Sequence, residues 1–129
     1  MARILVVDNT PTIRELYDDI LSDEGHEVHV ETGPDLDLDQ VEQCAPNLII
    51  LGYLFGAEAL GLVMLHHLRT RPTTVRIPII MCTGADQHIK DVQSDLERQR
   101  IVVLPKPFAV DDLLALVEHA LSGHGAEVQ

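Results

Sequence analysis

The chain has 129 residues, with 9 Lys and Arg against 21 Asp and Glu and a formal net charge of -12. This length suits one domain that can bury a core without disulfides or metal staples. Apolar residues make up 46% of the chain and aromatic residues 3%. Because an acidic chain repels a phosphate backbone and offers few rings for stacking, direct nucleic-acid binding is not expected.

The two cysteines, Cys44 and Cys82, lack the spacing of a zinc site or a disulfide framework, so we expect two reduced thiols. The N-terminus leads directly into an aliphatic run without a cleavable apolar region, and no apolar run approaches about 18 residues. We therefore expect a cytoplasmic protein without membrane contact.

Short aliphatic runs alternate with amphipathic stretches along the whole chain, which predicts a parallel sheet with crossover helices. In the first part we expect a strand over 4–7, a helix after the turn at 9–11, an edge strand over 27–31 and an acidic helix over 35–43. Gly25 marks the end of the first helix. Its inward face is expected to carry Ile13, Leu16, Tyr17, Ile20 and Leu21.

In the second part we expect strands over 48–51, 79–82 and 101–105, with helices over 62–71, after Gly84 and over 110–121. The helix after Gly84 has only Ile89, Val92 and Leu96 as inward candidates, so it is predicted to be the least firmly held. Residues 122–129 lack an apolar pattern and are expected to fray, leaving one domain over 1–121.

Polar residues follow the predicted strands at one rim of the sheet. Asp8, Thr83 and Lys106 come directly after the first, fourth and fifth strands, and Gly52 follows the third. Because right-handed crossovers place these strand ends on one rim, a carboxylate, a hydroxyl and an ammonium are expected to converge on Gly52.

Four segments at this spacing carry a resemblance to a known family. They read Ile-Leu-Val-Val-Asp-Asn (4–9), Ala-Pro-Asn-Leu-Ile-Ile-Leu-Gly (45–52), Ile-Pro-Ile-Ile-Met-Cys-Thr-Gly-Ala (77–85) and Leu-Pro-Lys-Pro-Phe (104–108). Together they resemble the receiver domain of two-component response regulators over residues 3 to 121. The resemblance implies an α/β, flavodoxin-like fold: a doubly wound five-stranded parallel sheet of order 2-1-3-4-5, with a role in phosphorelay signalling.

The resemblance also assigns roles to the strand ends. An acidic pair after the first strand holds magnesium, an aspartate after the third accepts the phosphoryl group, a Thr or Ser follows the phosphate and a Lys pairs with it. Here Asn9 stands at the second acidic position and Gly52 at the acceptor position. Glycine supplies no nucleophile, and with Asp8 as the one remaining acidic ligand, magnesium binding is expected to be weak or absent.

These residues predict a protein-binding module that acts without phosphorylation and is not an enzyme. We expect a partner such as a histidine kinase or a downstream signalling protein, bound by a surface that includes Ile89, Val92, Val103 and Val110. With the acceptor absent, an Asp8–Lys106 salt bridge is favoured over metal binding. The partner, the pathway, a homodimer and an output domain in a longer protein are all left open by the sequence.

Two alternatives stay open. A different carboxylate, such as Glu58, could accept the phosphoryl group, or the vacated pocket could bind a metabolite or anion. Tyr53, Leu54 and Phe55 form an apolar group near this pocket and are expected to cap the core, with a partner-binding or pocket-filling plug as the other interpretation. His66 and His67, adjacent on a helix, are expected to be solvated.

Overall fold

The computed structural model describes residues 2–32, 37–53, 58, 60–84, 96, 98, 101–106 and 108–122. Its elements are, in chain order, β1 (Arg3–Val7), α1 (Pro11–Asp23), β2 (Glu27–Glu31), α2 (Leu38–Cys44), β3 (Leu48–Gly52), α3 (Leu60–Leu68), β4 (Ile79–Thr83), β5 (Val102–Pro105) and α5 (Val110–Leu121).

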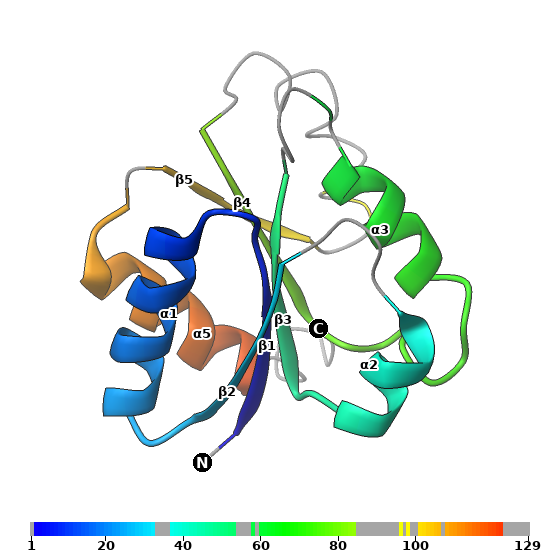
Figure 1. The fold of residues 1–129 in the computed structure, drawn as a ribbon, viewed down its shortest axis with the longest axis horizontal. Helices are drawn as coiled ribbons and strands as arrows, with labels where there is room; N and C mark the ends of the chain where they lie inside the picture. Colours follow the sequence, from blue (N-terminus) through cyan, green and yellow to red (C-terminus); the bar gives the residue numbers. More distant parts are fainter. Residues whose placement is uncertain are drawn as a thin grey trace.

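The strands form one five-stranded sheet in the order β2-β1-β3-β4-β5, and every neighbouring pair is parallel (Figure 1). The predicted fold class and strand order are confirmed. The register aligns Val7 with Leu51, and Leu51 with Met81. The carboxyl ends of the central strands therefore lie level at one rim.

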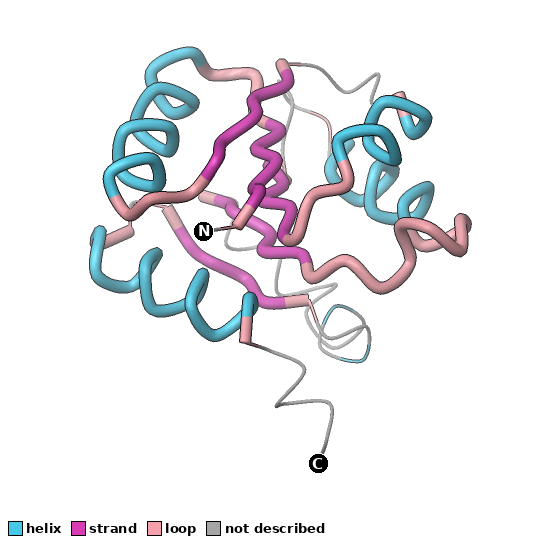
Figure 2. Tube along the Cα trace, turned by 90° about the horizontal axis from the view of Figure 1, so that it is seen from below, coloured by secondary structure: helices cyan, strands magenta, loops and turns pink. Residues whose placement is uncertain are grey.

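Helices cover both faces of the sheet. α1 and α5 lie on one face, and α2 and α3 lie on the other (Figures 1 and 2). Alternate residues of the central strands point to opposite faces, so a continuous aliphatic strand supplies both layers of the core. The layer under α1 and α5 includes Ile4, Val6, Tyr17, Leu21, Ile50, Leu113 and Val117, and the layer under α2 and α3 includes Leu5, Val7, Val41, Leu51, Met64 and Leu68.

The residues that α1 buries follow the helical period predicted from the sequence, with one exception. Tyr17 and Leu21 are buried and Ile20 is half-buried, but Leu16 is 41% exposed. Placing Leu16 on the inward face was wrong, because it falls at the margin of a stripe centred on Tyr17 and Leu21. The helix ends at Asp23, and the predicted stop signal, Gly25, follows two residues later with a φ of 88° and donates its N–H to the carbonyl of Ser22.

α2 begins at Leu38, three residues later than the predicted start at residue 35. The Asp37 side chain accepts hydrogen bonds from the backbone N–H groups of Asp39 (2.9 Å) and Gln40 (3.4 Å). Asp37 is therefore the N-cap, which is the preferred position of an aspartate that precedes a helix.

α3 spans Leu60–Leu68, so the predicted range of 62–71 was displaced at both ends. At its C-terminal end, the buried Thr74 hydroxyl donates to the carbonyl of Leu68 (2.5 Å). The Arg69 guanidinium donates to the carbonyls of Val75 and Ile77 in the turn that follows. These bonds close the chain into a loop where helical periodicity alone suggested another turn of helix.

The remaining predictions concern the edges of the domain. β2 is an edge strand as predicted, and α5 has the predicted bounds. Ile89 and Val92 of the predicted helix after Gly84, and the tail over 123–129, lie outside the described residues, whereas Leu96 is buried. No helix in the described part of the chain has the length and apolar character that crossing a membrane requires.

Candidate functional site

Asp8 occupies the end of β1 and both of its carboxylate oxygens are engaged. Oδ1 accepts a hydrogen bond from the N–H of Thr10 (2.9 Å), and Oδ2 lies 3.1 Å from Nζ of Lys106. The Asp8 side chain is 5% exposed and that of Lys106 is 28% exposed. A buried carboxylate requires such partners because losing its hydration is costly. The predicted salt bridge is present.

Lys106 is positioned by the pairing of the last two strands. Its backbone N–H donates to the carbonyl of Thr83 (2.7 Å), which continues the β4–β5 ladder past Pro105. Thr83 is itself 2% exposed at the end of β4. The strand order therefore brings Asp8, Thr83 and Lys106 to one rim, as the sequence predicted.

Gly52 ends β3 and is paired with Cys82 of β4. The next residue, Tyr53, donates its backbone N–H to the Cys82 carbonyl (3.1 Å), so the ladder extends one residue beyond the glycine. The Tyr53 side chain is buried in the layer under α2 and α3, which agrees with a core-capping role. Leu54 and Phe55 lie outside the described residues.

The described residues near Asp8 supply few oxygen atoms for a cation. Asn9 is exposed, and its side-chain oxygen meets the Thr10 hydroxyl at 3.5 Å. Gly52 contributes no side chain. No three His, Cys, Asp or Glu side chains in the described ranges lie close enough together to hold a metal ion. Magnesium prefers several oxygen ligands in octahedral array, and this rim supplies one carboxylate that a lysine already neutralises.

A buried polar pair beneath the rim was missed by the sequence reasoning. The Tyr17 hydroxyl meets no nitrogen or oxygen partner among the described residues, and the polar group beside it is the Cys82 thiol. Burial raises the pKa of Tyr17, and it also raises the pKa of the Cys82 thiol. The Tyr17 ring stacks on Phe108 with centroids 5.7 Å apart. The signal in the sequence was that Cys82 and Phe108 each lie within two residues of a rim residue.

Other candidates lie apart from this constellation. Glu58 is exposed. His66 and His67 are exposed as predicted, with ring centroids 6.1 Å apart. Of the proposed partner surface, Val110 is 45% exposed at the first residue of α5, whereas Val103 is half-buried against the core.

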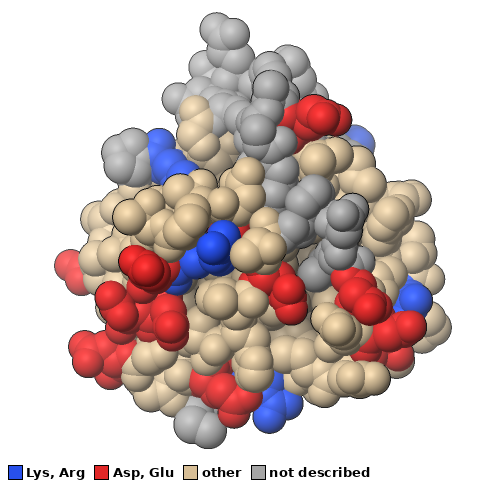
Figure 3. Space-filling model, in the orientation of Figure 1, with Lys and Arg blue, Asp and Glu red and all other residues tan. Residues whose placement is uncertain are grey.

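The surface charge is consistent with the acidic composition. Figure 3 shows acidic side chains gathered over α1 and along the lower edge, with basic side chains scattered between them. Arg71 is held by Asp39 (2.8 Å) and Glu42 (2.6 Å), and Arg69 is held by backbone carbonyls. These arginines therefore do not form a free basic stripe.

Comparison with known proteins agrees with this geometry. The family model of the response regulator receiver domain matches residues 4–118. NtrX from Brucella abortus has a TM-score of 0.82 and 33% identity, covering 98% of this chain and 28% of the NtrX chain. The separate receiver domain of NtrX has a TM-score of 0.76 and 30% identity, covering 92% of this chain and 98% of that domain.

Among curated proteins, the phosphate regulon transcriptional regulatory protein PhoB of Escherichia coli strain K12 is 28% identical over 116 residues, which are 90% of this chain and 50% of PhoB. The chain spans about half the length of the curated relatives it matches. The sheet order, the strand-end residues and the family match together lead to one conclusion: this chain belongs to the response regulator receiver domain family of two-component signalling.

Proposed function

We propose that this chain is a receiver module that signals through protein contacts and takes no phosphoryl group at the rim of the sheet. Receiver domains are signalling modules that interact with histidine kinases or with downstream proteins. The observation that carries the proposal is the pairing of Asp8 with Lys106 beside a glycine at the end of β3.

The first support is the chemistry of Gly52. Phosphoryl transfer to a protein carboxylate needs a nucleophilic oxygen placed in line with the donor, and glycine has no side-chain atom to offer. The family pattern places the acceptor at this strand end. We therefore assign Gly52 to the acceptor position and infer that the acceptor has been lost.

The second support is the state of the groups that remain. The Lys106 ammonium lies 3.1 Å from an Asp8 carboxylate oxygen, so each charge already has its counterion. An incoming phosphate would have to displace Asp8 from Lys106. If Asp8 moved, it would also lose the hydrogen bond that it accepts from the Thr10 N–H. The rim residues therefore favour the Asp8–Lys106 salt bridge over a phosphate or magnesium site.

The alternatives have less support from the described residues. Asp8 could accept a phosphoryl group only by giving up its partners, and Glu58 is exposed to solvent. A metabolite or anion bound at Lys106 would face the Asp8 carboxylate, which repels it. Among the described residues, no contact favours either alternative.

We assign the partner surface to Ile89, Val92, Val103 and Val110, and Val110 is the exposed apolar residue among the described members. Val110→Asp should reduce partner capture without unfolding the domain, because this side chain is not part of the core. Asp111→Ala, at the next position, which is also exposed, is the control.

Intact mass after incubation with magnesium and acetyl phosphate tests the proposal. We expect no adduct, and unchanged mass with and without the donor. An adduct of about 80 Da, the mass of one phosphoryl group, that hydroxylamine removes would show an acyl phosphate and overturn the proposal. Peptide mapping of that adduct would then identify the accepting carboxylate.

A further inference from the structure

β2 is an edge strand of the described sheet, and its outer side is a candidate site for a further strand. Within the described part of the chain, β2 pairs with β1 alone. At one end of this pairing the N–H of Glu27 donates to the carbonyl of Ala2 (2.8 Å), and at the other the carbonyl of Glu31 accepts from the N–H of Asp8 (3.1 Å). Because a parallel ladder uses alternate residues, the N–H and carbonyl groups of Val28 and Val30 point away from the sheet. These groups can bond an added strand.

The strand lacks three of the features that usually protect an edge, namely proline, lysine and a bulge. Glu27–Glu31 contains no proline or lysine, and its register with β1 runs without a bulge. Val30 is 44% exposed, on the side of the sheet that α1 covers. Regular edges of this kind are templates for strand addition by another chain.

The other side of the strand is acidic. Glu27, His29 and Glu31 alternate with the valines and therefore face the α2 side. The Glu27 carboxylate is paired with Arg3 (2.9 Å) and with His29 (2.5 Å). No described cation pairs with Glu31. The Glu31 carboxylate is therefore available to pair with a cation of a partner.

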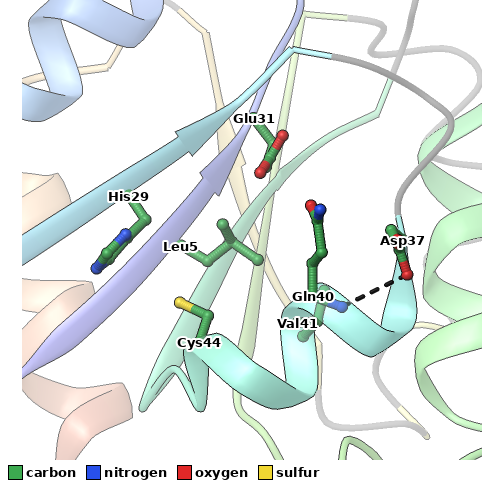
Figure 4. A pocket seen from close by; sticks show the side chains of 7 residues that line it. All are labelled: Leu5, His29, Glu31, Asp37, Gln40, Val41 and Cys44. Atoms are coloured by element: carbon green, nitrogen blue, oxygen red, sulfur yellow. Dashed lines mark hydrogen bonds between the residues drawn. The ribbon is translucent and has the colours of Figure 1, made fainter.

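A small cavity lies between this side of β2 and α2, as Figure 4 shows. Its volume is about 60 Å³, and its lining residues are Leu5, His29, Glu31, Asp37, Gln40, Val41 and Cys44. The Glu31 carboxylate and the Gln40 amide point toward one another across it. Since one water takes up about 30 Å³ in the liquid, the cavity has room for one small head group, such as an ammonium.

We propose that the β2 edge and this cavity bind an extended segment of a partner protein in which lysines alternate with β-branched apolar residues. Strand addition would place the apolar side chains beside Val28 and Val30 and the lysines on the side of Glu27 and Glu31. One ammonium enters the mouth of the cavity near Glu31 and Asp37. The inference rests on the proposed role as a protein-binding module, but not on the state of the Asp8–Lys106 pair.

Charge distinguishes this partner from a second copy of the chain. Residues 27–31 read Glu-Val-His-Val-Glu in both directions, so two copies could pair antiparallel about His29. That pairing sets Glu27 of each copy opposite Glu31 of the other, and like charges directly opposite destabilise a strand pair. The net charge of -12 adds to the repulsion. A basic strand removes both penalties.

The test uses a capped synthetic peptide, Gly-Ser-Lys-Val-Thr-Val-Lys-Ser-Gly, titrated into the whole chain while amide NMR spectra are recorded. We expect the largest shifts at Val28, Val30 and Glu31 and an affinity that falls with added salt. The same peptide with both lysines replaced by glutamate should not bind. Sedimentation of the free chain, across the concentrations used, should show a monomer.

Two variants separate the charge from the backbone contribution. Glu31→Gln should weaken peptide binding roughly two- to fivefold, as expected for a solvent-exposed ion pair. Val30→Pro removes an outward-pointing N–H and keeps the bonds to β1, so it should weaken binding about tenfold. Glu118→Gln, at an exposed position of α5, is the matched control and should leave the affinity unchanged.

Three results would overturn the inference: shifts outside β2 and α2, unchanged affinity in both variants, or a dimer that strengthens as acid neutralises the glutamates. The last result would assign the edge to a second copy. Glu31 contacts Asp8 through its backbone carbonyl, and Glu31→Gln changes the side chain alone. A failure here therefore leaves the acetyl phosphate result, and with it the proposed function, standing.

Discussion

Gly61, in the first turn of α3, lies so close to the end of β3 that a Cβ atom on it would sit 2.1 Å from the carbonyl oxygen of Gly52. The N–H of Gly61 donates to the carbonyl of Tyr53 (3.0 Å), so the helix start is joined directly to the strand end. The atoms in the way belong to the backbone, and no change of side-chain rotamer can make room. This contact places α3 against the rim where Gly52 stands.

Gly61→Ala should therefore destabilise the domain by about 1 to 3 kcal/mol, because the strand end or the helix must shift to admit the methyl group. Urea unfolding followed by circular dichroism measures the change. Gly84→Ala is the control: its Cβ would lie 3.9 Å from the Cβ of Lys106, which is an ordinary contact. We expect that variant to stay within about 0.5 kcal/mol of the parent. Equal effects of the two substitutions would contradict the tight contact.

Asp8→Asn should lower the free energy of unfolding by about 1 to 2 kcal/mol. The asparagine keeps an oxygen for the Thr10 N–H but leaves the Lys106 ammonium without its counterion. Lys106 is 28% exposed and can recover some hydration, so the lower part of this range is expected.

A double-mutant cycle with Lys106→Met isolates the ion pair. If the pair stabilises the fold as described, Lys106→Met should cost less in the Asp8→Asn background than in the parent, because the unpaired ammonium is removed. Additive losses from the two substitutions would show that Asp8 and Lys106 do not interact in solution.

The sheet could be predicted from sequence because its signals are local. The run Ile4-Leu5-Val6-Val7 and its counterparts are short, aliphatic and bounded by turn residues, and parallel order follows from the helices between them. Asp8 and Lys106 could be paired in advance because the carboxyl ends of parallel strands share a rim. The α5 bounds were also predicted, since its apolar period is regular.

Other features depend on contacts that no local pattern contains. Leu16 has the same hydropathy as Leu21, and only the rotation of α1 against the sheet exposes one and buries the other. The neighbourhood of Tyr17 and Cys82 joins residues of α1 and β4, far apart in the chain. The cavity beneath β2 likewise exists only once α2 has packed against the sheet.

Gly52→Asp combined with Asn9→Asp should restore a response to magnesium and acetyl phosphate, seen as an added mass of about 80 Da that hydroxylamine removes. The two substitutions return the carboxylates that the family pattern places at these strand ends. With Asp8, three carboxylates would then be available for a divalent cation, which would compete with Lys106 for Asp8.

The same double substitution combined with Asp8→Asn is the control, since it removes one of those three carboxylates and should reduce the adduct. If the double variant gains no added mass although circular dichroism shows an intact fold, the rim departs from a phosphoacceptor site in more than these two positions. The proposal that only the acceptor and one metal ligand are missing would then be wrong.

Cys82 gives the domain a stability that declines in alkali. Burial raises the pKa of its thiol, so the folded chain keeps the proton at a pH where the unfolded chain releases it. The unfolded state therefore binds fewer protons once the pH exceeds about 8.5, the ordinary thiol value, and stability must fall as pH rises from there to the folded-state pKa. Thermal unfolding measured from neutral pH into this range should show that decline.

Cys82→Ala should flatten this alkaline decline, although the smaller side chain lowers stability at neutral pH, and so the slopes with pH are compared rather than the melting temperatures. Cys44→Ala is the comparison variant, because burial also raises the pKa of Cys44 but that thiol lies at the half-buried end of α2. Its effect on the slope should be smaller. A decline that is the same in the parent and in Cys82→Ala would show that ionisation of this thiol does not cause it. Tyr17, whose ordinary pKa of about 10 is also raised by burial, would then be the group to test with Tyr17→Phe.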